Sequence, residues 1–126
     1  MSKTKPIGGY AEVRFNGEML LFRGDMTHNF QTEVKEGVVG RDKRSHGYTI
    51  KPVLPFIEGE FTHDGSFSTA DYEAISDATI TARLADGRVL VLRGAYVAGD
   101  IVVNDDDAKV KLKFEGTAGE ELKAAA

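Results

Sequence analysis

Two hairpin signals constrain the fold of this chain more than any other feature of its sequence. Asn16-Gly17 and Asp86-Gly87 are residue pairs that tight β-turns favour, because the central positions of these turns require positive φ angles. Each pair lies between segments rich in strand-forming residues. The sequence therefore predicts two antiparallel hairpins, over residues 10–23 and 79–97.

Residues 57–62 and 109–114 predict two more strands, each with one face in the core. Their apolar or small residues fall at alternate positions, and the positions between them are polar or charged. The exposed face is acidic in the first segment and cationic in the second. Val89–Leu92 is apolar at every position, so we expect it between two layers or in a contact between subunits. Altogether the pattern predicts six or seven strands.

The one predicted helix begins with a capping box. Ser68 supplies a hydroxyl and Asp71 a carboxylate three residues later, and together they satisfy two free backbone N–H groups. Phe67 and Tyr72 have the spacing of a hydrophobic staple. We expect the helix over residues 69–76, with Tyr72 and Ile75 on its core-facing side.

Residues 24–47 predict a long loop with a charged tip. They show little periodicity, although Phe30, Thr32 and Val34 alternate and could form part of an extended strand. Loops longer than about 12–15 residues are uncommon in compact domains and are usually functional or disordered. This loop is therefore the first place to look for function.

Composition narrows the classes of function. The 126 residues suit a single domain, and the net charge of −4 with a pI near 5.4 argues against a protein that grips nucleic acid. The absence of cysteine excludes a disulfide framework, a thiol nucleophile and a thiolate metal site. The longest apolar run falls far short of the ~20 residues of a membrane helix, so we expect no membrane association.

No motif predicts catalysis, a metal or a cofactor. The three histidines lie on separate segments without metal-ligand spacing, and no G-x-S-x-G elbow or phosphate-binding glycine motif is present. Asp105-Asp106-Asp107 lacks the glycine and glutamate of a calcium loop, which favours an acidic turn. We therefore expect no enzyme and no bound cofactor.

The second half of the chain resembles the tail tube proteins of Mu-like contractile-tailed bacteriophages. The similarity is an ordered pattern over residues 50–119: a short helix and turn, a hairpin, a leucine-rich strand that ends in an aromatic residue, a Gly-acidic turn and a last alternating strand. The residues that carry it include Ile75-Ser76-Asp77-Ala78, Leu84-Ala85-Asp86-Gly87, Tyr96, Gly99-Asp100 and Phe114-Glu115-Gly116.

This resemblance implies a mostly β fold, a β-sandwich or barrel-like tail tube subunit with one short flanking helix and a long loop. Residues 1–126 would form one domain, with a flexible arm over 1–9, an inter-subunit loop over 24–47 and a C-terminal tail over 117–126. Six copies would close into a ring, and stacked rings would form a tube that DNA and the tape-measure protein traverse. The implied partners are further copies and the tail sheath, tape-measure and baseplate proteins, in a virion made in the host cytoplasm.

Three sets of residues follow as candidate sites. An acidic channel wall would let DNA slide without specific binding, which places the glutamates of two strands in the lumen and the lysines of another on the exterior. The loop residues expected in contacts between subunits are His28, Phe30, Thr32, Val34, Arg41, Lys43 and Arg44. The candidate lumen residues are Glu12, Glu58 and Glu60, and the candidate exterior residues are Lys109, Lys111 and Lys113.

Two other classes of protein fit the same sequence. A ring-forming secretion-system tube similar to the Hcp proteins shares the implied architecture. A small β-barrel that binds a ligand or carbohydrate suits the composition, but such sites usually carry aromatic platforms. The chain has no tryptophan and only 4 tyrosines, which disfavours the binding protein.

Overall fold

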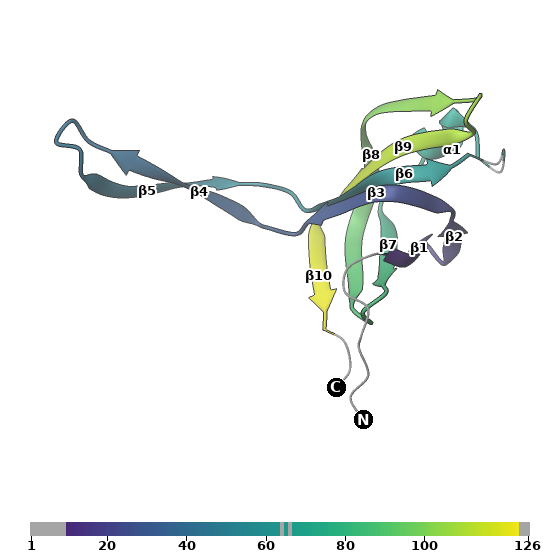
Figure 1. The fold of residues 1–126 in the computed structure, drawn as a ribbon, viewed down its shortest axis with the longest axis horizontal. Coiled ribbons are helices and arrows are strands. Elements are labelled where there is room, and N and C mark those ends of the chain that lie inside the picture. The colour runs from purple at the N-terminus through teal and green to yellow at the C-terminus, as the bar shows by residue number, and fades with distance from the viewer. Residues whose placement is uncertain (1–9, 64, 66, 124–126) are drawn as a thin grey trace.

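A computed structural model describes residues 10–63, 65 and 67–123 of the chain, so the predicted arm over residues 1–9 lies outside the described residues. Within them the predicted mostly β fold with one short helix is confirmed (Figure 1). The strands are β1 (Tyr10–Phe15), β2 (Glu18–Leu20), β3 (Phe22–Asn29), β4 (Glu33–Val39), β5 (Ser45–Pro52), β6 (Phe56–Thr62), β7 (Ala78–Leu84), β8 (Val89–Asn104), β9 (Lys109–Glu115) and β10 (Ala118–Leu122), and the helix is α1 (Thr69–Glu73).

Both predicted hairpins are present, although the second strand of the first hairpin ends at Leu20 and not at the expected Arg23. β1 and β2 pair across a turn in which Asn16 and Gly17 have φ angles of 47° and 86°, as a primed two-residue turn requires. β7 and β8 pair across the second turn, where Asp86 accepts hydrogen bonds from the backbone N–H and the guanidinium of Arg88. The backbone N–H bond is the larger of the influences that lower the pKa of the Asp86 carboxyl.

β8 is longer than the sequence suggested, and it is one side of a bent hairpin that crosses the whole body. β9 and β10 pair with the same edge of β8, β9 along its second half and β10 along its first half. The pairs Val97↔Phe114 and Leu92↔Gly119 belong to the same register, because moving five residues back along β8 moves the partner five residues forward. The two short strands β9 and β10 therefore continue one line of pairing with β8. The pairing shifts once, between Ala98 and Val102, where a bulge containing Gly99 lets β8 continue beyond its predicted end.

Two glycines form the corner of this hairpin. Gly94 has φ of +65°, a conformation that side chains other than glycine adopt at a cost. Gly116 approaches the opposite strand so closely that an added Cβ would lie 2.6 Å from the carbonyl oxygen of Arg93. Thr117 closes the corner, because its backbone N–H donates to the same oxygen at 2.9 Å. The corner therefore turns both strands from one sheet into the other.

The body consists of two sheets that share the long strand β8. One sheet has the order β2-β1-β7-β8-β10 and the other the order β8-β9-β6-β3. In Figure 1 the strands β7 and β10 run across β3, β6 and β9. β2 passes into β3 through Leu21, whose carbonyl accepts the N–H of Thr62 at 2.6 Å. The result is the expected sandwich with barrel-like corners.

The core fills the space between the two sheets. β6 and β9 alternate strictly between buried and partly or fully exposed residues, as their sequences predicted. Phe61 and Phe114 meet edge to face with ring centroids 6.1 Å apart. The largest fully buried side chains are Phe61, Phe114, Ile57, Ile80, Leu90, Leu92, Leu112, Val13 and Val110.

The helix closes the end of the body that lies away from β4 and β5 in Figure 1. Its capping box is present as predicted: Ser68 Oγ accepts the N–H of Asp71, and the Asp71 carboxylate accepts the N–H of Ser68. Phe67 stacks on Tyr72 at 5.7 Å, which confirms the staple. The helix ends at Glu73, short of the expected residue 76, and it buries Tyr72, while Ile75 beyond its end is half-buried against the core.

Two segments predicted as irregular form strands. Residues 24–47 contain most of β3, all of β4 and the start of β5, so the expected loop is mainly a long hairpin. Its alternation is hard to recognise because charged and apolar residues are mixed on both faces of an exposed ribbon. The predicted tail over 117–126 contains β10, which pairs with β8. Residues 124–126 of this tail lie outside the described residues.

Candidate assembly surfaces

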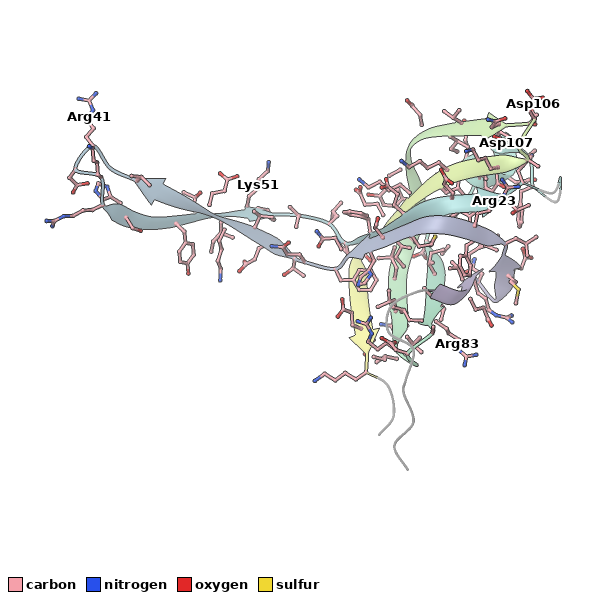
Figure 2. The ribbon with its side chains drawn as sticks, in the orientation of Figure 1. Arg23, Arg41, Lys51, Arg83, Asp106 and Asp107 are labelled. Atoms are coloured by element: carbon pink, nitrogen blue, oxygen red, sulfur yellow. The ribbon has the colours of Figure 1, made fainter. Side chains whose placement is uncertain are left out.

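A two-stranded arm, defined here as residues 33–52, extends from one side of the body (Figures 1 and 2). It consists of β4, β5 and the turn between them, paired from Glu33↔Pro52 to Val39↔Ser45. All residues of β5 are exposed, and in β4 only Val34 is half-buried. An isolated two-stranded hairpin is marginally stable in water. The arm therefore exposes a surface that a compact monomer would not require.

One face of the arm carries a strip of exposed apolar side chains beside charged ones. Residues opposite one another in an antiparallel pair share a face, which places Tyr48 and Ile50 on the same side as Lys35. Tyr48 is 58% exposed and Ile50 55% exposed, and the ammonium of Lys35 lies 5.3 Å from the centre of the Tyr48 ring. Val39, 73% exposed, lies near the tip. The side chains form an apolar strip with a cationic neighbour.

The tip of the arm is cationic and locally ordered. Gly40 donates its N–H to the carbonyl of Arg44 at 3.0 Å, which closes the turn. The Asp42 carboxylate accepts the N–H of Arg44 and lies 3.1 Å from Nε2 of His46. Asp42 is thus engaged within the turn, while the side chains of Arg41, Lys43 and Arg44 are exposed. These are the three tip residues predicted as inter-subunit contacts.

The other predicted contact residues lie at the base of the arm. His28 is the next-to-last residue of β3 on the body, and Phe30 and Thr32 belong to the connection between β3 and β4. Thr32 accepts the N–H of Val53 at 3.1 Å, which closes the base of the hairpin. Val34 is the second residue of β4. The seven predicted residues are therefore spread over the base, one strand and the tip of a single projection.

The outward side of β6 and β9, called the charged face here, corrects the predicted placement of charges. The register sets Glu58 opposite Lys113 and Glu60 opposite Lys111, and opposite residues share a face. The prediction that the glutamates and lysines occupy opposite sides of the subunit is wrong. Sequence alternation shows that each strand has one polar face, but it does not show that these two strands are neighbours. Lys109 lies on the same side, opposite Thr62.

Glu12, the third candidate lumen residue, lies on the other sheet. It belongs to β1 and pairs in register with Arg83 of β7. Its carboxylate accepts a hydrogen bond from Arg14, and this bond is the main cause that holds the pKa of Glu12 below its usual value. Glu12 therefore does not form one surface with Glu58 and Glu60.

The histidines of the described residues lie in three separate settings. His28 Nε2 lies 3.1 Å from the Glu121 carboxylate, His46 interacts with Asp42, and His63 Nδ1 lies 3.3 Å from the Tyr72 hydroxyl. Within residues 10–63, 65 and 67–123, no three acidic or histidine side chains gather as metal ligands would. The same part of the chain has no helix that is long and apolar enough to cross a membrane.

Comparison with known proteins identifies the family. The family model for the phage tail tube protein matches residues 4–121. The chain belongs to this family. This tail tube protein is also similar to a solved structure titled "Cryo-EM structure of the anti-feeding prophage cap (AFP tube terminating cap)", with a TM-score of 0.60. The two chains are 11% identical, and the match covers 98% of this chain and 94% of the other.

The structural match shows that the fold is shared, and the family match confirms the resemblance found in the sequence. A comparison with curated protein sequences gives no match. Membership of the family makes this tail tube protein a structural component of a virion tail. The sequence prediction missed the apolar strip, although Tyr48 and Ile50 alternate with Thr49 and Lys51 in the way that strands do.

Proposed function

We propose that this tail tube protein assembles with copies of itself into hexameric rings that stack into a hollow tube for the passage of phage DNA. The main support for this proposal is the exposed arm. It exposes both faces of a two-stranded ribbon, and a second copy that packs against the strip around Tyr48 and Ile50 would supply the missing apolar contacts. A surface that binds a different surface of the next copy produces rings or filaments.

The distribution of charge supports contact between the arm of one copy and the body of another. The arm carries a net charge of +2, whereas the whole chain carries −4, so the remainder carries −6. Opposite potentials favour encounter and fix orientation. The arm's basic residues are Lys35, Arg41, Lys43, Arg44 and Lys51, and its acidic residues are Glu33, Glu36 and Asp42.

A second surface supports association through the body. Val89 and Val91 of β8 are half-buried on the outward side of their sheet, and Leu122 of β10 is 44% exposed in register with Val89. β10 is also the last strand at its edge of the sheet. An edge strand beside apolar side chains is a surface that another chain can cover.

The charges of the body suit a conduit that does not hold DNA. On the charged face each of two lysines lies opposite a glutamate, so that face would release few counterions to a phosphate backbone if it lined the channel. We propose that DNA passes without specific binding, and that the protein has no catalytic role. Sheath, tape-measure and baseplate proteins are the proposed partners outside, inside and at the end of the tube.

The structural neighbour terminates a tube, and a shared fold is compatible with a subunit at the end of a tube or along its length. The family match supports the second role in this chain. A secretion-system tube is the other proposal from the sequence. A neighbouring gene for a tail sheath and tape measure would favour the phage, and genes for a secretion apparatus would favour the alternative.

Replacement of the arm tests the proposed function. Residues 33–52 can be exchanged for a short Gly-Ser turn, because Thr32 and Val53 are already joined by a hydrogen bond. The arm contributes little buried surface, so the variant should keep the melting temperature of the body and lose assembly in sedimentation and electron microscopy. Tubes formed by the armless variant would contradict the proposal.

A double variant and a matched control test the apolar strip of the arm by itself. Tyr48→Ser with Ile50→Thr removes the apolar strip, and Thr49→Ser on the opposite face of the arm is its matched control. We expect the double variant to assemble at least about tenfold more weakly, from the loss of roughly 1.4 kcal/mol or more of apolar burial. The control should assemble as the parent does.

A further inference from the structure

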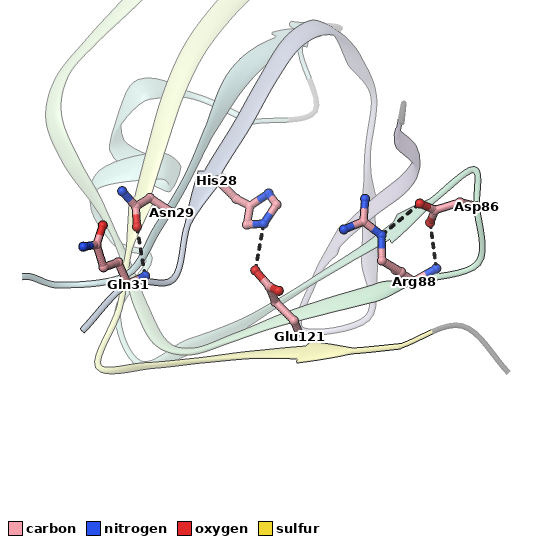
Figure 3. Close-up of polar contacts among 6 residues, drawn as sticks. All are labelled: His28, Asn29, Gln31, Asp86, Arg88 and Glu121. Carbon is pink, nitrogen blue, oxygen red and sulfur yellow. Dashed lines mark hydrogen bonds and ion pairs between the residues drawn. The ribbon is translucent and has the colours of Figure 1, made fainter. Parts of the chain in front are cut away.

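The arm's connection to the body contains contacts between residues far apart in sequence, and Figure 3 shows the one between His28 and Glu121. His28 Nε2 at the end of β3 lies 3.1 Å from the Glu121 carboxylate of β10. Phe30 packs over Gly119, where an added Cβ would lie 2.6 Å from Cγ of the ring. We call these four residues the root contact. They border a surface hollow of about 500 Å³.

The root contact bridges two strands that do not pair with each other. β10 lies at the edge of one sheet, and β3 lies at the end of the other. The Phe30 ring is half-buried against the core, and the His28 ring meets it edge to face at 5.2 Å. These side-chain contacts join the two sheets directly before the chain leaves the body.

Short-range hydrogen bonds connect the root contact to the arm. Asn29 Oδ1 accepts the N–H of Gln31 at 2.9 Å (Figure 3). Gln31 Nε2 in turn donates to the carbonyl of Glu33 at 2.7 Å. Thr32 then pairs with Val53 at the base of the hairpin. A displacement of Phe30 is thus carried into the first pair of the arm.

We propose that Phe30 and Gly119 are positioning residues that set the direction in which the arm leaves the body, with His28 and Glu121 as a second tie. The inference rests on the proposed function, since a direction matters only if the tip must reach a site on another copy. Glycine is required at position 119 because any side chain would occupy the space of the Phe30 ring. The short strand β10 therefore controls a distant contact surface.

The length of the arm makes small errors at the root important. About nine residues separate Thr32 from Arg41, which corresponds to roughly 30 Å of extended strand. A tilt of about 10° at the base moves the tip by about 5 Å, the spacing between neighbouring strands. An alanine at position 119 would lie about 1 Å too close to the Phe30 ring for ordinary van der Waals contact, so the ring must move.

Distance measurement between two spin labels tests this inference in the full chain. The chain has no cysteine, so Arg41→Cys at the tip and Arg83→Cys on the body give two unique labels (Figure 2). Double electron–electron resonance is recorded on dilute protein, below the concentration of assembly. We expect a narrow distribution in the parent and, with Gly119→Ala, a mean shifted by roughly 5 Å or a clearly broadened distribution.

Matched variants separate a positioning role from loss of folding. Gly24→Ala on β3 is the control, because a Cβ there meets nothing within 4 Å. Phe30→Leu combined with Gly119→Ala provides room for the new methyl and should return the distribution toward that of the parent. Glu121→Gln should broaden the distribution more than Glu120→Gln, whose carboxylate pairs instead with Arg93. Circular dichroism verifies that each variant is folded.

The outcomes distinguish this inference from the proposed function. A Gly119→Ala distribution that superimposes on the parent's, in a folded protein, overturns the inference and leaves tube formation standing. A shifted distribution with unchanged tube formation also overturns it, since the direction would then not matter. If the parent never assembles, the proposed function fails whatever the distances show.

Discussion

Alanine at Gly116 should destabilise the body, because this glycine lies where the bent hairpin passes from one sheet to the other. The added Cβ would lie 2.6 Å from the carbonyl oxygen of Arg93 and 2.8 Å from Cδ1 of Leu92. Neither neighbour can move easily. Leu92 is fully buried, and the Arg93 carbonyl accepts hydrogen bonds from both the N–H and the hydroxyl of Thr117.

The size of the stability loss expected for Gly116→Ala follows from two opposing effects. Overpacking in a closely packed site costs about 1–3 kcal/mol, and replacement of glycine by alanine recovers about 0.4–1 kcal/mol by restricting the unfolded chain. The net loss is roughly 1–2 kcal/mol. With an unfolding entropy of about 2.1 cal/mol/K for each residue, this loss lowers the melting temperature by about 4–8 °C.

Thermal unfolding followed by circular dichroism measures the effect on Gly116→Ala. Gly24→Ala is the matched control, since position 24 has open space for a Cβ, and its melting temperature should stay the same or rise slightly. Equal melting temperatures for the two variants would contradict the expected destabilisation at Gly116. They would show that the corner adjusts freely and that the bent hairpin does not depend on a close approach at Gly116.

Three further predictions concern the core and the charges. Phe114→Ala should lower the free energy of unfolding by about 3–5 kcal/mol in chemical denaturation, because the ring is fully buried; a loss below about 1 kcal/mol would contradict its place in the core. Glu58→Lys with Glu60→Lys should lower the melting temperature at low salt and recover in high salt, because five lysines would then share the charged face; a loss independent of salt would argue against it. The hydrogen bond to the Glu115 carboxylate is the main cause that raises the pKa of Tyr96 above its usual 10.0. The stability that this bond provides is therefore present below that pH and is lost as the pH rises through the raised pKa. Ultraviolet titration of the Glu115→Gln variant should show that the upward shift of the Tyr96 pKa is removed.

Local sequence signals were enough to predict several elements of the body, but they missed β10, most of β3 and the second half of β8. The turn at Asn16-Gly17, the cap at Ser68 and the alternation of β6 and β9 each depend on residues close together in the chain. For these elements the preferred local structure and the final fold agree. The arm was predicted less well, since its two faces differ too little in polarity to show a clear period.

The same local signals could not predict which strands are neighbours or which residues far apart in sequence are in contact. The neighbourhood of β6 and β9, which puts Glu58 opposite Lys113, joins residues 55 positions apart and follows from the path of the whole chain. The root contact joins His28 to Glu121 across 93 positions. Both bring together segments far apart in the chain, and their partners are not encoded by the residues next to them.

Cryo-electron microscopy of the purified protein, over a range of concentrations, tests whether it assembles as proposed. We expect hollow tubes of stacked rings with six-fold symmetry, in which the arm of each copy lies against the body of another. Compact monomers at every concentration, or rings with a symmetry other than six-fold or pseudo-six-fold, would contradict it.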